Sequence, residues 1–396
     1  MVDFLNESLR QFDYTKSMRR DFHMHPELGF NEIRTSGIVA RELEALGLEV
    51  TKGVGKTGVV ALLEGARPGP TLLARFDMDA LPILEETGAE YASQTPGVMH
   101  ACGHDGHTAI GLTVARMLNA HRDQLAGTVK FVFQPAEETL GEEGLGGAET
   151  MIRDGVLEGP RPDYALGLHL WNEQPLGWIG VAAGPVMAGA DEFKLVITGK
   201  GGHGAVPHAT IDPMVAAAHV ITALQTITSR NVAPLQAAVV SATTIHGGTA
   251  FNVIPQEITL RGTIRTFELA VRRKVLERFE EIVRGVAGGL GCQVDIKIIQ
   301  VTPAVINDDP VAVRVQDTAR RVLSGSQLDI SNYTTMGAED MAFILERVPG
   351  CFFFIGSANR ERGLDYGHHH PKFDVDEDAM PRAAALMATA LADFLK

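Results

Sequence analysis

The sequence has few cysteines, no excess of basic charge and no long apolar run. Its 396 residues include only three cysteines, an odd and small number for a disulfide-stabilised secreted protein. The formal net charge of −14 disfavours nucleic acid or an anionic membrane as a partner. No apolar stretch reaches the length of a transmembrane helix, and the N-terminal segment lacks the apolar run of a signal peptide. These absences predict a cytoplasmic protein, in a reducing compartment that would protect a reactive thiol.

The sequence does contain five side chains that can bind a metal, spread over most of its length. A thiolate, imidazoles and a carboxylate together suit zinc, manganese, cobalt or nickel rather than calcium or magnesium. Four protein ligands would close a structural zinc site, whereas five suffice for two divalent metals that share a bridging group. Glu137 directly precedes one of these residues, and a carboxylate beside a metal-activated water is what hydrolysis requires. The five residues are Cys102, His104, Glu138, His169 and His369.

Each motif alone has a simpler interpretation. The Cys-x-His pair could be buried structural residues, the Glu-Glu pair a solvated helix start, His169 a core histidine and the three-histidine run a surface tract. Their positions favour a site. Glu137 follows a predicted strand over residues 128–135, His169 ends one over 164–169, and Cys102 and His104 precede a predicted helix over 105–121. Sites of α/β proteins form just past the carboxyl ends of strands.

The order of predicted elements indicates two domains, as the length and the hydrophobic content of 45% allow. Over residues 1–184, and again over 302–396, helices alternate with strands, which is typical of an α/β domain with a mainly parallel sheet and helices on both faces. Residues 185–301 instead follow the order β-α-β-β-α-β of a ferredoxin-like α+β unit. If His369 joins Cys102 and His104, this unit is an insertion. Cys292 and Cys351 lie in apolar, strand-like runs, and we expect both in the core.

A series of motifs resembles the metal-dependent amidohydrolases. This branch holds hippurate hydrolase, bacterial N-acyl-amino-acid hydrolases and plant indoleacetyl-amino-acid hydrolases, within the larger family of aminoacylases and zinc carboxypeptidases. The resemblance extends from about Met18 to about Glu377. The motifs, in order, are MRRDFHMHPELGFNE, RFDMDALP, MHACGHDGHTA, FQPAEE, GLH, GGHGAVPH, FNVIP, GTIR, MGAEDMAF and HHPKFD.

The resemblance implies a role for each matching residue. Cys102 would bridge two metals, with His104, Glu138, His169 and His369 as the remaining ligands; the run of three histidines leaves the register of His369 open. Glu137 would be the general acid/base. The positions that hold the substrate carboxylate and the carbonyl oxygen are matched by His203, Asn252 and Arg265.

One departure from the family pattern concerns the aspartates that follow a predicted strand. The wider family has His-x-Asp where this chain has Asp77-Met78-Asp79, which fits a branch that takes its bridging ligand from Cys102. We expect Asp77 and Asp79 to orient metal ligands from behind. A plain turn at the strand end is the alternative.

The resemblance implies a small N-acyl amino acid as substrate. Residues 1–184 and 302–396 would form the catalytic domain, and residues 185–301 would close over the site and pair two subunits into a homodimer or larger oligomer. The alternatives are a dipeptidase or carboxypeptidase, and a metal-binding homologue without activity. The Gly-rich run GKGGHGAVPH could suggest a phosphate loop, but it lacks the Lys-Ser/Thr ending of one.

Overall fold

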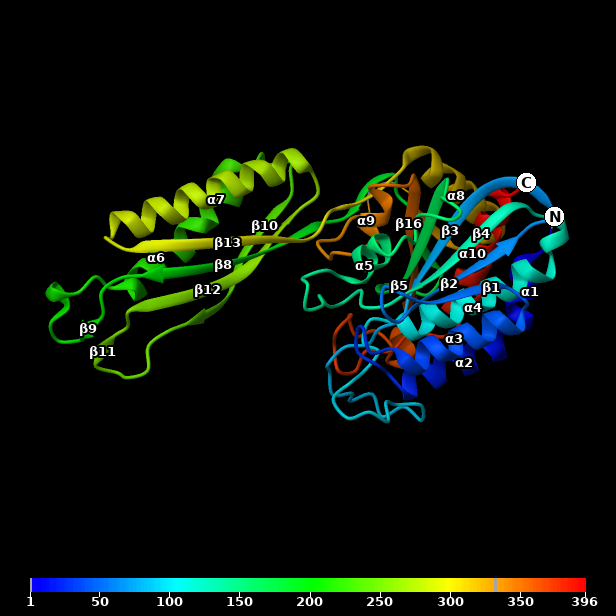
Figure 1. Ribbon diagram of the computed structural model, residues 1–396, viewed down its shortest axis with the longest axis horizontal. Coiled ribbons are helices and arrows are strands. Elements are labelled where there is room, and N and C mark those ends of the chain that lie inside the picture. The colour runs from blue at the N-terminus through cyan, green and yellow to red at the C-terminus, as the bar shows by residue number, and fades with distance from the viewer. Residues whose placement is uncertain (1, 331–332) are drawn as a thin grey trace. The chain divides into compact units, whose positions relative to one another are not determined.

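The chain divides into two compact units, which we describe for residues 2–330 and 333–396 from a computed structural model (Figure 1). Unit 1 comprises Met1–Val186, Ile306–Tyr333 and Asp340–Lys396. Unit 2 comprises Met187–Val305 and Thr334–Glu339. Unit 2 therefore interrupts unit 1 in sequence, and it includes a short segment, 334–339, that lies beyond the expected insertion.

Unit 1 is built on an eight-stranded mixed sheet. Its central strands are parallel: β3 pairs in this sense with β4 and β5, and β5 with β16. Antiparallel pairs flank this centre on both sides. The expected mainly parallel sheet is confirmed. In spatial order the strands are β1 (Glu49–Val54), β2 (Gly58–Glu64), β4 (Ala126–Gln134), β3 (Arg67–Asp77), β5 (Tyr164–Pro175), β16 (Gly350–Ala358), β6 (Trp178–Gly180) and β15 (Gln327–Asp329).

Helices cover both faces of this sheet. In Figure 1, α2, α3 and α4 lie along one side, and α5 and α9 lie on the other. The most deeply buried helix among these five is α4, where Gly111 permits close approach: a Cβ there would lie 2.7 Å from the ring of Phe76. The helices are α1 (Phe4–Arg10), α2 (Phe12–Met24), α3 (Ile33–Ala45), α4 (His104–Ala120), α5 (Gly147–Arg153), α8 (Asp309–Val322), α9 (Met341–Leu345) and α10 (Ala379–Phe394).

Unit 2 contains a four-stranded antiparallel sheet with two helices packed on it. The strand order β10-β12-β8-β13 is that of a ferredoxin-like unit, as the sequence predicts. Along β12, buried positions alternate with more exposed ones, so one face packs against the helices. The elements are β8 (Gly189–Thr198), α6 (Pro213–Thr226), β10 (Ala238–His246), β12 (Glu257–Thr266), α7 (Leu269–Gly289) and β13 (Gln293–Thr302).

Local sequence signals explain where several elements begin. The side chain of Asp212 accepts a hydrogen bond of 2.9 Å from the backbone N–H of Met214, and Pro213 opens α6, so the helix start is capped and pre-shaped. Asp308 caps α8 in the same way. Both cysteines expected in the core are buried, Cys351 in unit 1 and Cys292 in unit 2.

Several short elements were not expected from the sequence. A two-stranded ribbon in unit 2 pairs β9 (Gly202–His203) with β11 (Val253–Ile254). The strands β7 (Gly184–Met187) and β14 (Val305–Asn307) also pair, where the chain passes from one unit to the other. Within the described residues, no helix is both long enough and apolar enough to cross a membrane.

Candidate metal centre

The ends of three neighbouring strands and the start of α4 bring the predicted ligands together. β3 ends at Asp77 and β4 at Gln134, just before Glu137 and Glu138. His169 does not end a strand, because β5 continues to Pro175 along β16. However, β3 pairs with β5 only as far as Arg75 opposite Gly167, so His169 lies where its neighbouring strand stops. The start of α4 follows Gly103, whose φ of +93° turns the chain between Cys102 and His104.

Two groups of side chains share Cys102. In the first group the ligand-type atoms of Cys102, His104 and His169 lie within 4.8 Å of one another. The same limit holds for the second group, Cys102, Glu138 and His369. Cys102 Sγ is 3.5 Å from Nε2 of His169, and Nε2 of His369 is 2.8 Å from Oε1 of Glu138. All five predicted ligands therefore meet around one thiol.

The ring of His104 is held by one nitrogen. Nδ1 lies 3.0 Å from the backbone oxygen of Asp79 and 3.2 Å from its Oδ1. Nε2 is buried and has no hydrogen-bond partner among the described residues. A charged neighbour, Oδ2 of Asp77, lies 3.8 Å from it. Buried polar atoms normally have a hydrogen-bond partner, so a ring with Nε2 unbonded and Nδ1 fixed by a carboxylate fits a metal ligand.

The charges of the group also fit a divalent cation. Burial, and then the carboxylates of Glu138 and Glu137, raise the pKa of the Cys102 thiol well above its usual range. Burial opposes the charged form of His104, but Asp77 and Asp79 outweigh it and raise its pKa to about 10. Burial and the imidazole of His107 lower the pKa of His169, which keeps it neutral. A cation would stabilise the Cys102 thiolate among these carboxylates, and the donor set fits zinc, manganese, cobalt or nickel.

The three consecutive histidines differ in their surroundings. Among them, His369 is the one that joins Cys102 and Glu138. It has a φ of +65°, and its N–H donates a hydrogen bond of 2.8 Å to the backbone oxygen of Ala101. His368 instead packs against Trp171, and its Nε2 lies 3.1 Å from the oxygen of Leu170. This geometry supports the predicted register.

Glu137 lies beside the metal-capable atoms, on a tight turn. Carboxylate oxygens of Glu137 and Glu138 and a ring nitrogen of His104 all lie within 4.8 Å of one another. The preceding residue, Ala136, is buried and has a φ of +48°, a conformation that residues other than glycine rarely adopt. The backbone N–H of Glu138 donates to Oδ2 of Asp79 over 3.0 Å. Asp79 therefore contacts both His104 and the Glu137–Glu138 turn.

Asp77 reaches the centre through a histidine that sequence reasoning missed. Its carboxylate accepts from Nδ1 of His107 over 2.6 Å and from Nη1 of Arg75 over 2.5 Å. Nε2 of His107 accepts a hydrogen bond of 2.8 Å from the N–H of Leu170, the residue after His169. His107 thus has both nitrogens engaged and holds the backbone next to His169. The spacing of His104 and His107, one helical turn apart, was the available signal.

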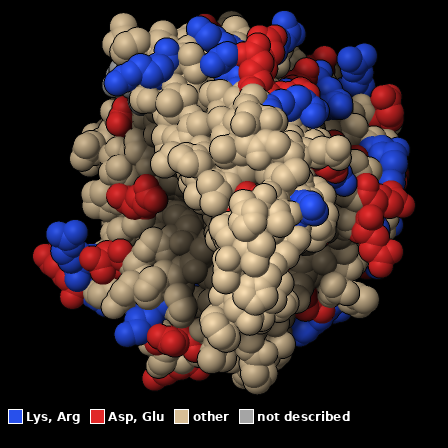
Figure 2. All heavy atoms as spheres, turned by 90° about the vertical axis from the view of Figure 1, so that its left-hand side faces the viewer, with Lys and Arg blue, Asp and Glu red and all other residues tan. Residues whose placement is uncertain are grey.

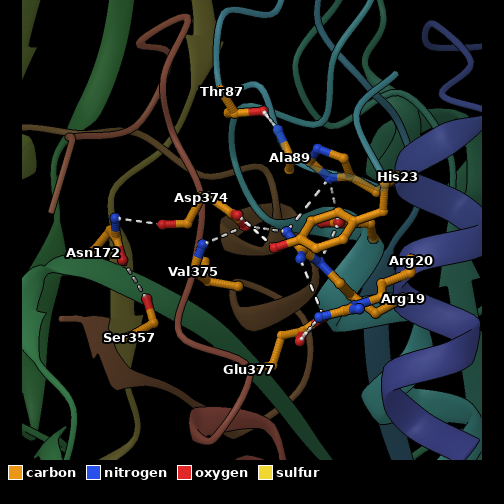
Figure 3. A network of polar contacts seen from close by, with 12 residues as sticks. Arg19, Arg20, His23, Thr87, Ala89, Asn172, Ser357, Asp374, Val375 and Glu377 are labelled. Atoms are coloured by element: carbon orange, nitrogen blue, oxygen red, sulfur yellow. Dashed lines mark hydrogen bonds and ion pairs between the residues drawn. The ribbon is translucent and has the colours of Figure 1, made fainter. Parts of the chain in front are cut away.

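A buried ionic network joins residues that neighbour the predicted ligands in sequence, and Figure 3 shows part of it. Arg19 of α2 is fully buried and donates over 2.7 Å to Asp105, next to His104, and over 2.6 Å to Asp374. Figure 3 shows the guanidinium groups of Arg19 and Arg20 pointing toward Asp374 and Glu377. The backbone oxygen of Asp374 accepts from Asn172 of β5 over 3.0 Å. The network therefore ties together the segments that carry His104, His169 and His369.

The three predicted substrate-binding residues lie in unit 2, at opposite ends of its sheet. Val253, next to Asn252, pairs with His203 in the β9–β11 ribbon, and both His203 and Asn252 are exposed. Arg265 is half-buried at the far end of β12, where it pairs with Ala190. β12 rises roughly 3.3 Å per residue, so about 26 Å of strand separates Arg265 from the end of β12 nearer the ribbon. Within unit 2, His203 and Asn252 belong to the same ribbon, where the N–H of Gly204 donates to the backbone oxygen of Asn252 over 2.8 Å, and Arg265 lies at the other end of the sheet.

Comparison with known proteins assigns the chain to a family. Residues 73–393 match the model described as peptidase family M20/M25/M40, so the chain belongs to this family. It is 41% identical to N-acetylcysteine deacetylase of Bacillus subtilis over 373 residues, 94% of each chain. It is 39% identical to thermostable carboxypeptidase 1 of Saccharolobus solfataricus over 397 residues, 100% of this chain and 99% of the relative.

A solved structure agrees with this assignment. The crystal structure of Bacillus subtilis YXEP, described as a dinuclear metal binding peptidase from the M20 family, matches with a TM-score of 0.82 and 37% identity. The match covers 97% of this chain and 98% of that chain. The chain is therefore an enzyme, an amidohydrolase of the M20 family, as its motifs indicate.

Proposed function

We propose that the chain hydrolyses the amide bond of N-acyl amino acids at a centre that binds two divalent metals. The observation that carries this proposal is that Cys102 belongs to both groups of ligand-type side chains. A relative named N-acetylcysteine deacetylase, 41% identical over nearly the whole chain, supports an N-acyl amino acid as substrate. The description of YXEP as a dinuclear metal binding peptidase supports the metal number.

The residues around Cys102 would divide the chemistry among them. Bound divalent metals lower the pKa of a coordinated water and polarise the substrate carbonyl. Glu137 would take the proton of the attacking water and deliver it to the leaving amine, while Glu138 would serve as a ligand. Glu137 lies beside the ligand-type atoms of His104 and Glu138, within reach of a shared water. Asp79 would keep His104 oriented, because its carboxylate and backbone oxygen both meet Nδ1 of that ring.

Residues of unit 2 would recognise the substrate. Arg265 and Asn252 would hold the free carboxylate, since a guanidinium binds a carboxylate bidentately, and His203 would donate to the developing oxyanion. Arg265 and His203 lie at opposite ends of the unit 2 sheet. For both to reach the same substrate, a second subunit would supply one of these two residues to the site. Unit 2 would thus serve as the lid and the dimerisation domain, and unit 1 as the catalytic domain.

The end of unit 2 that carries β9 and β11 supports an association of subunits. Figure 2 views this end, and much of its central area is free of charged side chains. Phe251 is fully exposed there, and Val253 is 50% exposed. Exposed apolar side chains at an end that also carries functional residues are typical of an interaction surface. We propose a homodimer in which this end meets a second copy.

A carboxypeptidase is the second candidate function. It is favoured by the relative named thermostable carboxypeptidase 1, which is 39% identical over the full chain. Both reactions cleave an amide bond next to a free carboxylate, so they use the same centre and differ in the acyl side of the substrate.

A hydrolysis screen after metal exchange tests these proposals. The protein is stripped with a chelator, reloaded with zinc, manganese, cobalt or nickel in turn, and assayed with acetyl, benzoyl and indoleacetyl amino acids and with short peptides. We expect reversible loss of activity on chelation, two metals bound per chain by elemental analysis, and faster turnover of the N-acyl amino acids. Full activity with only one metal bound would contradict the dinuclear centre, and preference for peptides would favour the second candidate.

A further inference from the structure

The segment between α2 and α3 packs against the two loops that carry Asp79 and Glu137. The backbone oxygen of Glu27 accepts a hydrogen bond of 2.8 Å from the N–H of Ala80. Five residues later, Oε1 of Glu32 accepts one of 2.9 Å from the N–H of Ala136. Between them, Gly29 lies so close that a Cβ there would be 3.0 Å from Cα of Ala136. This segment is PELGFNE in the sequence, a motif to which the proposed mechanism assigns no role.

The turn at Ala136 is held in an uncommon conformation from several directions. Its φ of +48° lies in the left-handed region, where alanine is rarely found. Its N–H is bound by Glu32, and its oxygen accepts a hydrogen bond of 2.9 Å from the N–H of Gly147. Gly147 itself has no room for a side chain, since a Cβ would lie 1.6 Å from the oxygen of Pro135. Such a conformation persists only where the surroundings impose it, commonly at functional sites.

Glu32 does not use its side chain for its own helix. It occupies the N-cap position of α3, yet it makes no side-chain capping hydrogen bond. That task falls to Glu27, whose carboxylate accepts from the N–H groups of Arg34 and Thr35 over 3.0 and 2.9 Å. The carboxylate of Glu32 is fully buried. Its Oε1 accepts the hydrogen bond from Ala136, and its Oε2 accepts one from the hydroxyl of Thr57 over 2.5 Å.

This placement of Glu32 is electrostatically unfavourable. Burial, and then the nearby carboxylate of Asp79, raise the pKa of Glu32 to about 7. A helix cap alone would not require a fully buried carboxyl group beside a second carboxylate, because Glu27 already caps α3 at a half-buried position.

We infer that Glu32 is a positioning residue of the active site, which holds the left-handed turn at Ala136 and thereby sets the directions of Glu137 and Glu138. This inference rests on the roles proposed above for those two residues. Glu137 follows Ala136 directly, so a relaxation of φ at Ala136 would move both carboxylates. Displacement of an acid/base by about 1 Å can cost about 10²-fold in rate, and loss of a group that orients a metal ligand costs about 10–100-fold in metal affinity or activity.

The test compares variants within the same segment. Glu32→Ala is expected to lower kcat by about 100-fold and to weaken metal binding by about 10–100-fold in a chelator competition, with a smaller change in KM. Glu32→Gln should keep kcat and metal affinity close to wild type. Its amide oxygen can accept a hydrogen bond from the N–H of Ala136, and its amide N–H can donate one to the hydroxyl of Thr57. Glu27→Ala is the matched control: it removes the cap of α3 and should lower the melting temperature, but kcat and metal affinity should stay close to wild type.

A second variant addresses the turn without removing any polar group. Gly29→Ala would place a methyl group 2.5 Å from Cγ2 of Thr139 and 3.0 Å from Ala136, and it should reproduce the loss of kcat and metal affinity. Gly29→Ala also tests the inference if Glu32→Ala does not fold. Wild-type kcat and metal affinity in Glu32→Ala would overturn the inference, as would equal losses in Glu27→Ala or no recovery in Glu32→Gln. Glu137→Gln is assayed in parallel. If Glu137→Gln retains turnover, the proposed function is wrong. If Glu137→Gln loses turnover while Glu32→Ala keeps it, only the role inferred for Glu32 is wrong.

Discussion

His104 and His169 of unit 1 are buried, and in each ring Nδ1 is hydrogen-bonded to a neighbouring residue, whereas His203 and Asn252 of unit 2 are exposed. Behind the first pair lie Asp79, His107 and the ionic network of Arg19. The second pair belongs to a two-stranded ribbon, in which the ring of His203 accepts a hydrogen bond from the N–H of Ala205. Unit 1 has its ligand-type groups pre-arranged within a single chain.

This difference follows from the chemistry that each unit would carry. A metal centre needs several ligands fixed at once, and fixed ligands require buried partners that hold each ring and carboxylate in place. Groups that meet a substrate only after binding can stay exposed and complete their contacts in an assembled or closed state. The comparison therefore predicts that substitutions in unit 1 affect one subunit alone, while those at the ribbon of unit 2 can be compensated by a partner.

The largest effect is expected at Glu137, in the pre-arranged unit. Glu137→Gln should keep its metals and its substrate affinity but lose about 10²–10⁴-fold in kcat, since a neutral amide cannot take a proton. Glu138→Gln, the adjacent control, should instead weaken metal binding, because its carboxylate pairs with His369 and lies near Cys102. Elemental analysis and steady-state kinetics separate the two. Near-normal turnover in Glu137→Gln would remove the proposed mechanism.

Much of this arrangement could be predicted from the sequence. The mainly parallel sheet and the ferredoxin-like insertion follow from the order of the predicted elements and from the periodicity of apolar residues. The five ligands were expected from their motifs and from the family resemblance, and their role in binding metal stays a prediction. Asp77 and Asp79, expected to act from behind the ligands, do contact His107 and His104. The separation of Arg265 from Asn252 was not expected, because a strand pattern does not show which end of a sheet a residue occupies.

Other features depend on contacts between distant segments, which local patterns do not encode. Arg19 meets Asp374 across more than 350 positions of sequence, and Glu32 meets Ala136 across more than 100. The left-handed conformation of Ala136 has no signal of its own, since alanine there gives no hint of a positive φ. The ribbon of β9 and β11 was missed because each strand has only two residues, too few for a periodic pattern.

A mixing experiment tests whether the ribbon of unit 2 serves a second subunit. His203→Ala and Glu137→Gln, each nearly inactive alone, are combined to form heterodimers. If His203 acts across the interface, one site receives Glu137 from one chain and His203 from the other, and activity should recover to about half per heterodimer by two-fold symmetry. Activity measured after subunit exchange gives the answer. No recovery in verified heterodimers would place His203 in its own chain's site, and an active monomer in sedimentation would exclude the arrangement.

A smaller effect is expected when the substrate carboxylate is masked. If Arg265 binds this group, esterification of the substrate should lower kcat/KM of the wild type by about 10–150-fold, the range of a charged hydrogen bond of about 1.5–3 kcal/mol. The same ester should cost little in Arg265→Ala, whose guanidinium is already missing. Arg261→Ala is the control, since this exposed arginine of the same strand pairs with Glu192. Equal penalties in wild type and Arg265→Ala would show that Arg265 does not recognise the carboxylate.

The last effect concerns stability, at the buried His23 of unit 1. Burial and Arg19 oppose the charged form of His23, but Asp105 and Glu85 outweigh them and raise its pKa from 6.5 to about 9. A raised pKa contributes stability that is fully present below pH 6.5 and is lost as the pH rises through 9. The difference in unfolding free energy between wild type and His23→Gln should therefore shift by about 3 kcal/mol from pH 6 to above pH 9, at about 1.4 kcal/mol per pKa unit. Denaturant titrations of chelated protein at both pH values measure this shift. A His23→Gln profile parallel to that of wild type would mean that His23 is uncharged in the folded protein, and that Arg19 alone balances the carboxylates around it.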